Sequence, residues 1–222
     1  TAQPVTEADY MRAERMLREV HDVCEASFPP DFPVRANARN GLMIVYLKQG
    51  RFADAEPVLR EDLERARSTL GPEHRNTVAS MLNLAYALQN LGRADEAREL
   101  LEEALAAQLA TVGPEHERTL TTHFPLGKLH QSTGDLAGAE ACFRRAADGG
   151  RERLPDSAIV GNYLLGLGEV LLQAERYAEA ETVLAEAVSW TDRTWLAGSN
   201  GKVVDLLERA RALRASGPDS PR

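Results

Sequence analysis

Histidines are the residues of this 222-residue chain whose type and spacing first suggest chemistry, because clustered imidazoles can bind a metal ion. His74 and His116 stand 42 residues apart, and His123 and His130 stand seven apart on one predicted helix. Neither pair has a cysteine or carboxylate at ligand spacing, and the sequence contains no G-x-S-x-G motif and no Walker loop. We therefore predict no metal, no cofactor and no enzymatic activity.

A second set of polar residues lies beside the apolar stripes of four predicted helices. Asparagine amides both donate and accept hydrogen bonds, so they suit contact with the backbone of a partner, and an exposed tyrosine can anchor a partner side chain. The alternative is that each residue is a solvated position on an amphipathic helix. The candidate partner-binding residues are Asn37, Asn40, Asn83, Tyr86, Asn90, Lys128, Gln131, Asn162 and Glu169.

A sequence repeat of about 42 residues determines on which helices these side chains lie. Aligned segments, among them DAEPVL from Asp54 and EARELL from Glu96, recur around alanines at the same register. Self-similarity at this period indicates a helical solenoid, which offers a long surface rather than a pocket. The predicted fold is all-α, a right-handed solenoid of antiparallel helix pairs with about ten helices. The repeated alanines are Ala13, Ala55, Ala97, Ala139 and Ala180.

Each unit reads as a first and a second helix. In the clearest copy, the first runs over residues 74–91 with apolar residues at helical spacing, Gly92 ends it, and the second runs over residues 94–111. Two local exceptions are expected. Pro125 should kink or shorten the first helix of its unit, and the run RRAADGGRER from Arg144 reads as a frayed helix end followed by a loop. Trp190 and Trp195 are expected to seal the core at the last unit, the alternative being that they stack on a ligand.

The domain organisation predicted is one solenoid over residues 1–215, followed by a disordered tail at residues 216–222. Residues 1–33 match only the second helix of a unit, with Tyr10 in the place of Phe52. We expect that more protein precedes this half unit, the alternative being a native N-terminal cap. The predicted repeat units are residues 34–70, 71–112, 113–154 and 155–195, with a capping helix at residues 199–215.

The segment LNLAYALQNLGRADEARELLEEAL from Leu82, with the linkers TLGPEH from Thr69 and TVGPEH from Thr111, resembles the tetratricopeptide repeat in its long, kinesin-light-chain-like form. The sequence departs from that family at Arg75 and Glu117, where the family has proline. The resemblance implies that the first helices line a concave groove holding an extended or helical partner segment. Similar repeats follow the kinase or ATPase domains of bacterial signalling proteins.

The amino-acid composition limits the classes of partner that we expect the chain to bind. With 34 acidic against 26 basic residues, the chain lacks the concentrated basic surface that nucleic acids or anionic membranes require. The two cysteines fall at different repeat offsets, and we see no signal peptide or membrane-length apolar run, so we expect a cytoplasmic protein. The predicted function is binding of a protein or peptide partner. The alternatives are a regulatory or sensory region of a larger bacterial signalling enzyme, and a self-assembly element associating through its N-terminal end.

Overall fold

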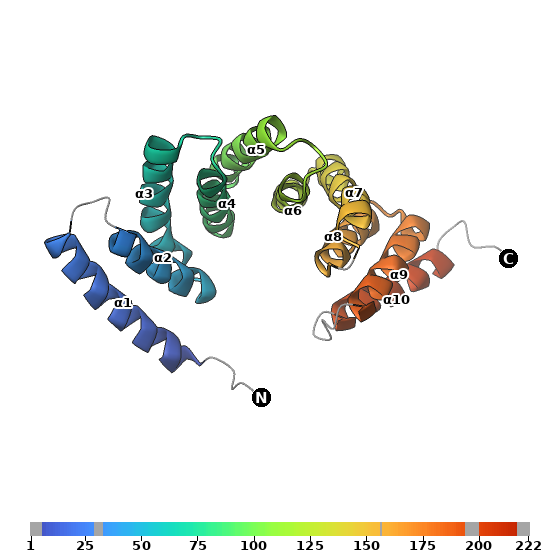
Figure 1. Ribbon diagram of the computed structural model, residues 1–222. Helices are drawn as coiled ribbons and strands as arrows, with labels where there is room; N and C mark the ends of the chain where they lie inside the picture. Colours follow the sequence, from blue (N-terminus) through green and yellow to red (C-terminus); the bar gives the residue numbers. More distant parts are fainter. Residues whose placement is uncertain (1–5, 29–32, 156, 194–199, 217–222) are drawn as a thin grey trace. The chain divides into compact units, whose positions relative to one another are not determined.

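The computed structural model describes residues 6–28, 33–155, 157–193 and 200–216. These residues form ten helices and no strand, which confirms the predicted all-α fold (Figure 1). The chain divides into two compact units, residues 1–97 and 98–222, and the boundary falls inside α5 (Ala94–Thr111). The tail predicted at residues 216–222 lies outside the described residues, except for Ser216. Trp195 also lies outside them.

The N-terminal unit is a stack of antiparallel helices in which each helix packs against the next along the chain. Thr6 begins the first helix with a capping box, because its side chain accepts from the Asp9 backbone while Asp9 bonds back to Thr6. Gly50 and Gly71 end later helices with φ of 68° and 86°, values that glycine adopts without strain. The helices are α1 (Glu7–Ser27), α2 (Pro33–Lys48), α3 (Phe52–Leu70) and α4 (Arg75–Asn90).

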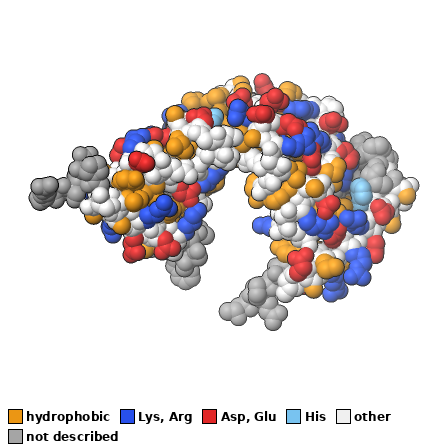
Figure 2. Space-filling view, turned by 180° about the vertical axis from the view of Figure 1, so that it is seen from behind, with side chains coloured by type: hydrophobic (Ala, Val, Ile, Leu, Met, Phe, Trp, Pro, Cys, Tyr) orange, Lys and Arg blue, Asp and Glu red, His pale blue; other side chains and the backbone are white. Residues whose placement is uncertain are grey.

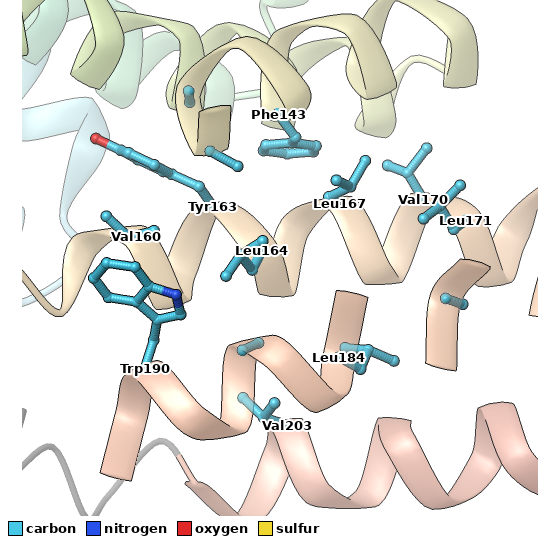
Figure 3. Packing of buried hydrophobic residues seen from close by; sticks show 14 of the residues in the cluster. Phe143, Val160, Tyr163, Leu164, Leu167, Val170, Leu171, Leu184, Trp190 and Val203 are labelled. Carbon is cyan, nitrogen blue, oxygen red and sulfur yellow. The ribbon is translucent and has the colours of Figure 1, made fainter. Parts of the chain in front are cut away.

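The C-terminal unit continues the same alternation after the last part of α5. Its core is a buried cluster that includes Phe143 (Figure 3), whose ring lies against Gly127 of α6 and Gly166 of α8. A Cβ added at Gly127 or Gly166 would approach that ring to 2.9 Å or 2.7 Å, so glycine is needed at both positions. The helices are α6 (Glu117–Ser132), α7 (Leu136–Arg153), α8 (Ile159–Gln173), α9 (Tyr177–Arg193) and α10 (Asn200–Ser216).

Trp190 extends this cluster to the last two helices. Its side chain is 7% exposed and belongs to the same buried group as Val160 on α8 and Val203 on α10 (Figure 3). The indole Nε1 donates to Glu186 Oε1 at 3.4 Å, which satisfies its one polar group. The predicted role of Trp190 in closing the core against the final helix is therefore confirmed.

One local prediction is wrong, and another is wrong in part. Helix α7 continues to Arg153 instead of fraying after Arg144, because Gly149 and Gly150 are buried and leave room for neighbouring side chains. A Cβ at Gly149 would lie 2.4 Å from Leu120 Cδ2 of α6. Pro125 does not shorten α6, which has 16 residues, the same length as α4. Proline removes one backbone donor, and the buried leucines on both sides of it keep the helix packed.

Candidate partner-binding face

One position recurs on the first helices α2, α4, α6 and α8, about 42 residues apart each time: Ile44, Tyr86, Lys128 and Glu169. None of these four side chains belongs to the buried apolar core. Together with the other predicted polar residues of these helices, they form what we call the first-helix face. Those residues are Asn37, Asn40, Asn83, Asn90, Gln131 and Asn162. It is described separately for each of the two units.

In the N-terminal unit this face is apolar at its centre. Ile44 is 53% exposed and Tyr86 is 50% exposed, so both side chains are available to a partner. The ring of Phe52, at the start of α3, meets the Tyr86 ring edge-on with centroids 5.5 Å apart. Tyr86 is thus held on one side by an aromatic contact and open on the other.

Asparagines surround these two side chains. Asn37 and Asn40 are exposed and precede Ile44 by seven and four residues, so all three share one face of α2. On α4, Asn83 is half-buried. Asn90 is exposed, and its Nδ2 donates to the Tyr86 backbone oxygen at 2.8 Å, so part of its hydrogen-bonding capacity is used within its own helix.

In the C-terminal unit the same face carries an ion bridge. Glu169 on α8 accepts from Lys128 Nζ of α6 at 2.6 Å and from Lys202 Nζ of α10 at 2.6 Å. The Glu169 side chain is only 14% exposed. Burial alone would raise the pKa of Glu169, but the hydrogen bonds from the two lysines lower it below its ordinary value. Glu169 therefore joins three helices as a carboxylate.

Glutamines continue the bridge toward the ends of the helices. Lys128 Nζ also donates to Gln131 Oε1 at 3.2 Å, and Gln131 Nε2 donates to Gln173 Oε1 at 3.3 Å. Beside them lies a hollow of about 340 Å³ between α6, α8 and α10. Arg209 on its wall forms no ion pair with any described residue. The lining residues are Gln131, Glu169, Leu172, Gln173, Leu206 and Arg209.

Aromatic rings under Lys128 help to fix its position. Its Nζ lies 5.6 Å from the centroid of Phe143 and 6.0 Å from that of Phe124. A cation above an aromatic face is attracted by the ring quadrupole. The core cluster that packs α6 on α7 and α8 therefore also orients the lysine at the surface.

The structure places the nine predicted residues on exposed or half-buried parts of the four first helices, and their role in binding remains a prediction. It brings Lys128, Gln131 and Glu169 together in one network. Asn162 is exposed on the same helix as Glu169, seven residues before it. Sequence reasoning missed Ile44, Gln173 and Lys202. Ile44 reads as a core residue when α2 is considered alone, but its register with Tyr86 marks it as a surface position.

Three of the histidines make structural contacts. His74 and His116 are the N-caps of α4 and α6, where each Nδ1 accepts from the backbone two residues on, at 3.2 Å and 3.1 Å. His130 Nδ1 lies 2.8 Å from Asp135 Oδ2, and burial lowers the pKa of His123. Within the described ranges no group of three or more His, Cys, Asp or Glu side chains could hold a metal ion.

Surface charge and hydropathy bear on other kinds of partner. Basic and acidic side chains are interspersed on the visible faces of both units (Figure 2). Among the helices that the structure describes, none combines the length and the apolar character needed to span a bilayer. The faces shown in Figure 2 carry no concentrated basic patch of the kind that binds nucleic acid.

Comparison with known proteins identifies the class. The tetratricopeptide repeat signature matches residues 34–107, 77–152 and 126–189, so the chain belongs to the tetratricopeptide repeat family. No curated protein sequence matches it. The predicted resemblance is confirmed by solved structures as well, since kinesin-light-chain-like repeat proteins share its fold.

Three solved structures illustrate the likeness. A putative kinesin light chain with nearly identical TPR-like repeats from Podosopora anserina is 21% identical, with a TM-score of 0.65, over 94% of this chain and 88% of that one. PlcR from Bacillus thuringiensis, solved with the peptide PapR7 and DNA, is 14% identical, with a TM-score of 0.63, over 91% of this chain and 70% of that one. A Rap protein complexed with Competence and Sporulation Factor is 15% identical, with a TM-score of 0.71, and this chain spans 60% of it.

Proposed function

We propose that the chain is a non-enzymatic interaction module that binds a peptide segment of a partner protein on its first-helix face. The observation that carries this proposal is the pair Ile44 and Tyr86, two large apolar side chains about half exposed at equivalent positions of successive first helices. An aromatic side chain that is held on one edge and open on the other is well suited to anchor a partner residue.

The asparagines supply what a bound peptide backbone needs. An extended segment that leaves water must find donors and acceptors for its N–H and C=O groups. Asn37, Asn40 and Asn83 offer both kinds of group beside the apolar pair and form no hydrogen bond among the described side chains. Binding through backbone contacts with two apolar anchors would give affinity with moderate sequence selectivity.

The C-terminal unit carries a charged contact surface of its own. Lys128, Lys202 and Arg209 lie on or beside the hollow, against the single carboxylate of Glu169. This balance favours an acidic partner side chain over a basic one, because a second cation would be repelled. Leu172 and Leu206 would contact the apolar part of that residue.

The likeness to PlcR and Rap supports a peptide as the kind of partner, since PlcR was solved in complex with the peptide PapR7. The identities of 14% and 15% support the fold alone. The case for this chain therefore depends on the exposed side chains of its own first helices.

The test is selection of binders from a random peptide library on the purified chain, followed by fluorescence anisotropy with the selected peptides. The Ile44→Ala/Tyr86→Ala variant should raise the dissociation constant about tenfold or more, as loss of interface anchors does. Leu109→Ala is the matched control, because Leu109 is also exposed, at 45%, but lies on the second helix α5.

Two results would contradict the proposal. One is a library that yields no binder to the intact chain at any concentration tested. The other is a selected peptide whose affinity is unchanged by Ile44→Ala/Tyr86→Ala, or is reduced equally by Leu109→Ala. In the latter case the binding surface would not be the first-helix face.

A further inference from the structure

Helix α1 carries an apolar stripe that no described part of the chain covers. Met16, Val20 and Val23 are 57%, 47% and 61% exposed. With Ala13 they recur at steps of three, four and three residues, the spacing that lines one side of a helix in a coiled-coil contact. The adjacent side of α1, which includes Leu17 and the buried Cys24, packs toward α2.

The repeat shows that this side of a second helix is normally covered by another helix. The residues equivalent to Val20 in α5, α7 and α9 are Ala104, Ala146 and Ala187, and all three are fully buried. The residue of α7 equivalent to Val23 is Gly149, which is buried close to Leu120 of α6. The stripe of α1 is therefore a helix-packing surface in its geometry as well as in its composition.

Charged residues flank the stripe on the side that faces away from α2, which we call its free edge, and they indicate which helix covers the stripe. Arg12 and Arg15 lie toward the N-terminal end of this edge, and Glu19 and Asp22 lie toward the C-terminal end. All four side chains are exposed, and Arg15, Glu19 and Asp22 form no ion pair with any described residue. A helix with basic residues at one end and acidic residues at the other is complementary to itself when it is turned end for end.

We propose that two copies of this chain associate through α1, with the two helices antiparallel and their Met16, Val20 and Val23 stripes in contact. About a dyad near residue 17, Arg12 of each copy faces Asp22 of the other, and Arg15 faces Glu19. A parallel pair would instead place like charges side by side, at a cost in free energy. The contact is isologous, so it closes at two copies.

This association is independent of the proposed peptide binding, because α1 contributes no residue to the first-helix face. The primary experiment is sedimentation of the intact chain from about 1 μM to about 1 mM, a range that covers weak dimers. The expected result is a concentration-dependent shift from 24.3 kDa to twice that mass. A chain that stays at 24.3 kDa throughout this range overturns the proposal.

Substitutions then locate the interface. Met16→Glu should raise the dissociation constant about tenfold or more, because it buries a carboxylate against an apolar stripe. Met11→Glu is the control, since Met11 is equally exposed, at 60%, but lies off the stripe. Circular dichroism checks that both variants keep their helix content. Equal effects of the two substitutions, or no effect of Met16→Glu, would overturn the assignment to this stripe.

The charge pattern permits a further test, in which two charge-reversed variants associate only with each other. Arg12→Glu/Arg15→Glu and Glu19→Lys/Asp22→Lys should each remain monomeric when alone, and a mixture of the two should form a one-to-one dimer. Orientation is tested by mixing Arg12→Cys with Asp22→Cys under mild oxidation. An antiparallel pair gives the mixed disulfide. A parallel pair gives the Arg12→Cys homodimer, which would overturn the proposed geometry.

Discussion

Arg98 and Asp135 occupy the positions that Glu56 and Arg93 hold one unit earlier, with the two charges exchanged. In the regular units an arginine before the second helix bonds a glutamate on the preceding second helix, as Arg51 does with Glu14 at 2.6 Å and Arg176 with Glu140 at 2.6 Å. Arg93 contacts Glu56 in the same way.

The reversed pair keeps the attraction. The Gly138 N–H is the main cause that lowers the pKa of the Asp135 carboxyl, and His130 and Arg98 lower it further. The charge is also reversed at a third position. Glu102 follows Arg98 by four residues, whereas one unit earlier Arg60 follows Glu56 by four residues. The repeated contact thus depends on complementary charge, and the order of signs along the chain is free to invert.

The first prediction concerns this pair. Arg98→Glu and Asp135→Arg should each destabilise the protein, and the double variant should be more stable than the sum of the single effects predicts. Exposed pairs contribute little, so we expect a coupling on the order of 1–3 °C in Tm. A double-mutant cycle measured by thermal melts cancels the loss of the Asp135 cap, which is common to both arms. Additive effects would show that the two charges do not interact.

The second prediction concerns the core of the N-terminal unit. Leu84→Ala should lower the free energy of unfolding by about 2–5 kcal/mol, because Leu84 is 2% exposed and truncation leaves a cavity. Leu109→Ala, at an exposed leucine, should change it by less than about 0.5 kcal/mol. Urea unfolding followed by circular dichroism measures both. An unchanged midpoint for Leu84→Ala would show that the helix register is wrong.

The third prediction concerns a close helix contact in the C-terminal unit. A Cβ at Gly168 would lie 2.6 Å from Leu184 Cγ, and Leu184 is fully buried. Gly168→Ala should therefore cost about 1–3 kcal/mol, despite the better helix propensity of alanine. At Gly201 a Cβ would meet nothing within 4 Å, so Gly201→Ala should be neutral or stabilising. The reverse order of stabilities in urea would contradict the packing of α8 against α9.

The fourth prediction concerns pH. The pKa of Glu169 is lowered in the folded state, so the unfolded state takes up its proton first as the pH falls below the ordinary value of 4.5. The stability that Glu169 contributes is therefore present above that pH and is lost as the pH falls through its folded pKa. Glu169→Gln should make stability less steep in pH between about 5 and 3, measured by urea midpoints. Glu152→Gln, at an exposed residue without an ion pair to any described residue, is the control, and an equal flattening there would contradict the assignment.

The sequence predicted the helices well because apolar spacing and glycines mark them directly. The second helix at residues 94–111 has the predicted bounds, and α4 differs from its prediction by one residue at each end. The errors arose where local rules were overridden by packing. Gly149 and Gly150 suggest a loop by composition, but inside α7 they give Leu120 and Val160 space that any side chain would take.

The candidate site was predicted less completely, for a physical reason. Lys128 and Glu169 could be selected as polar residues beside an apolar stripe, but Lys202, on a helix outside the repeat register, could be paired with Glu169 only from coordinates. Ile44 could not be separated from core residues by hydropathy, since an exposed and a buried isoleucine look the same in sequence. Only its alignment with Tyr86 carried the information.

The most direct test of the proposed function is photo-crosslinking with a library-selected peptide. A photoreactive phenylalanine analogue at position 44 or 86 should crosslink to the peptide, and the same analogue at position 109 should not, because it lies on a second helix. Crosslinking at position 109 but at neither 44 nor 86 would contradict the account and move the binding surface off the first helices.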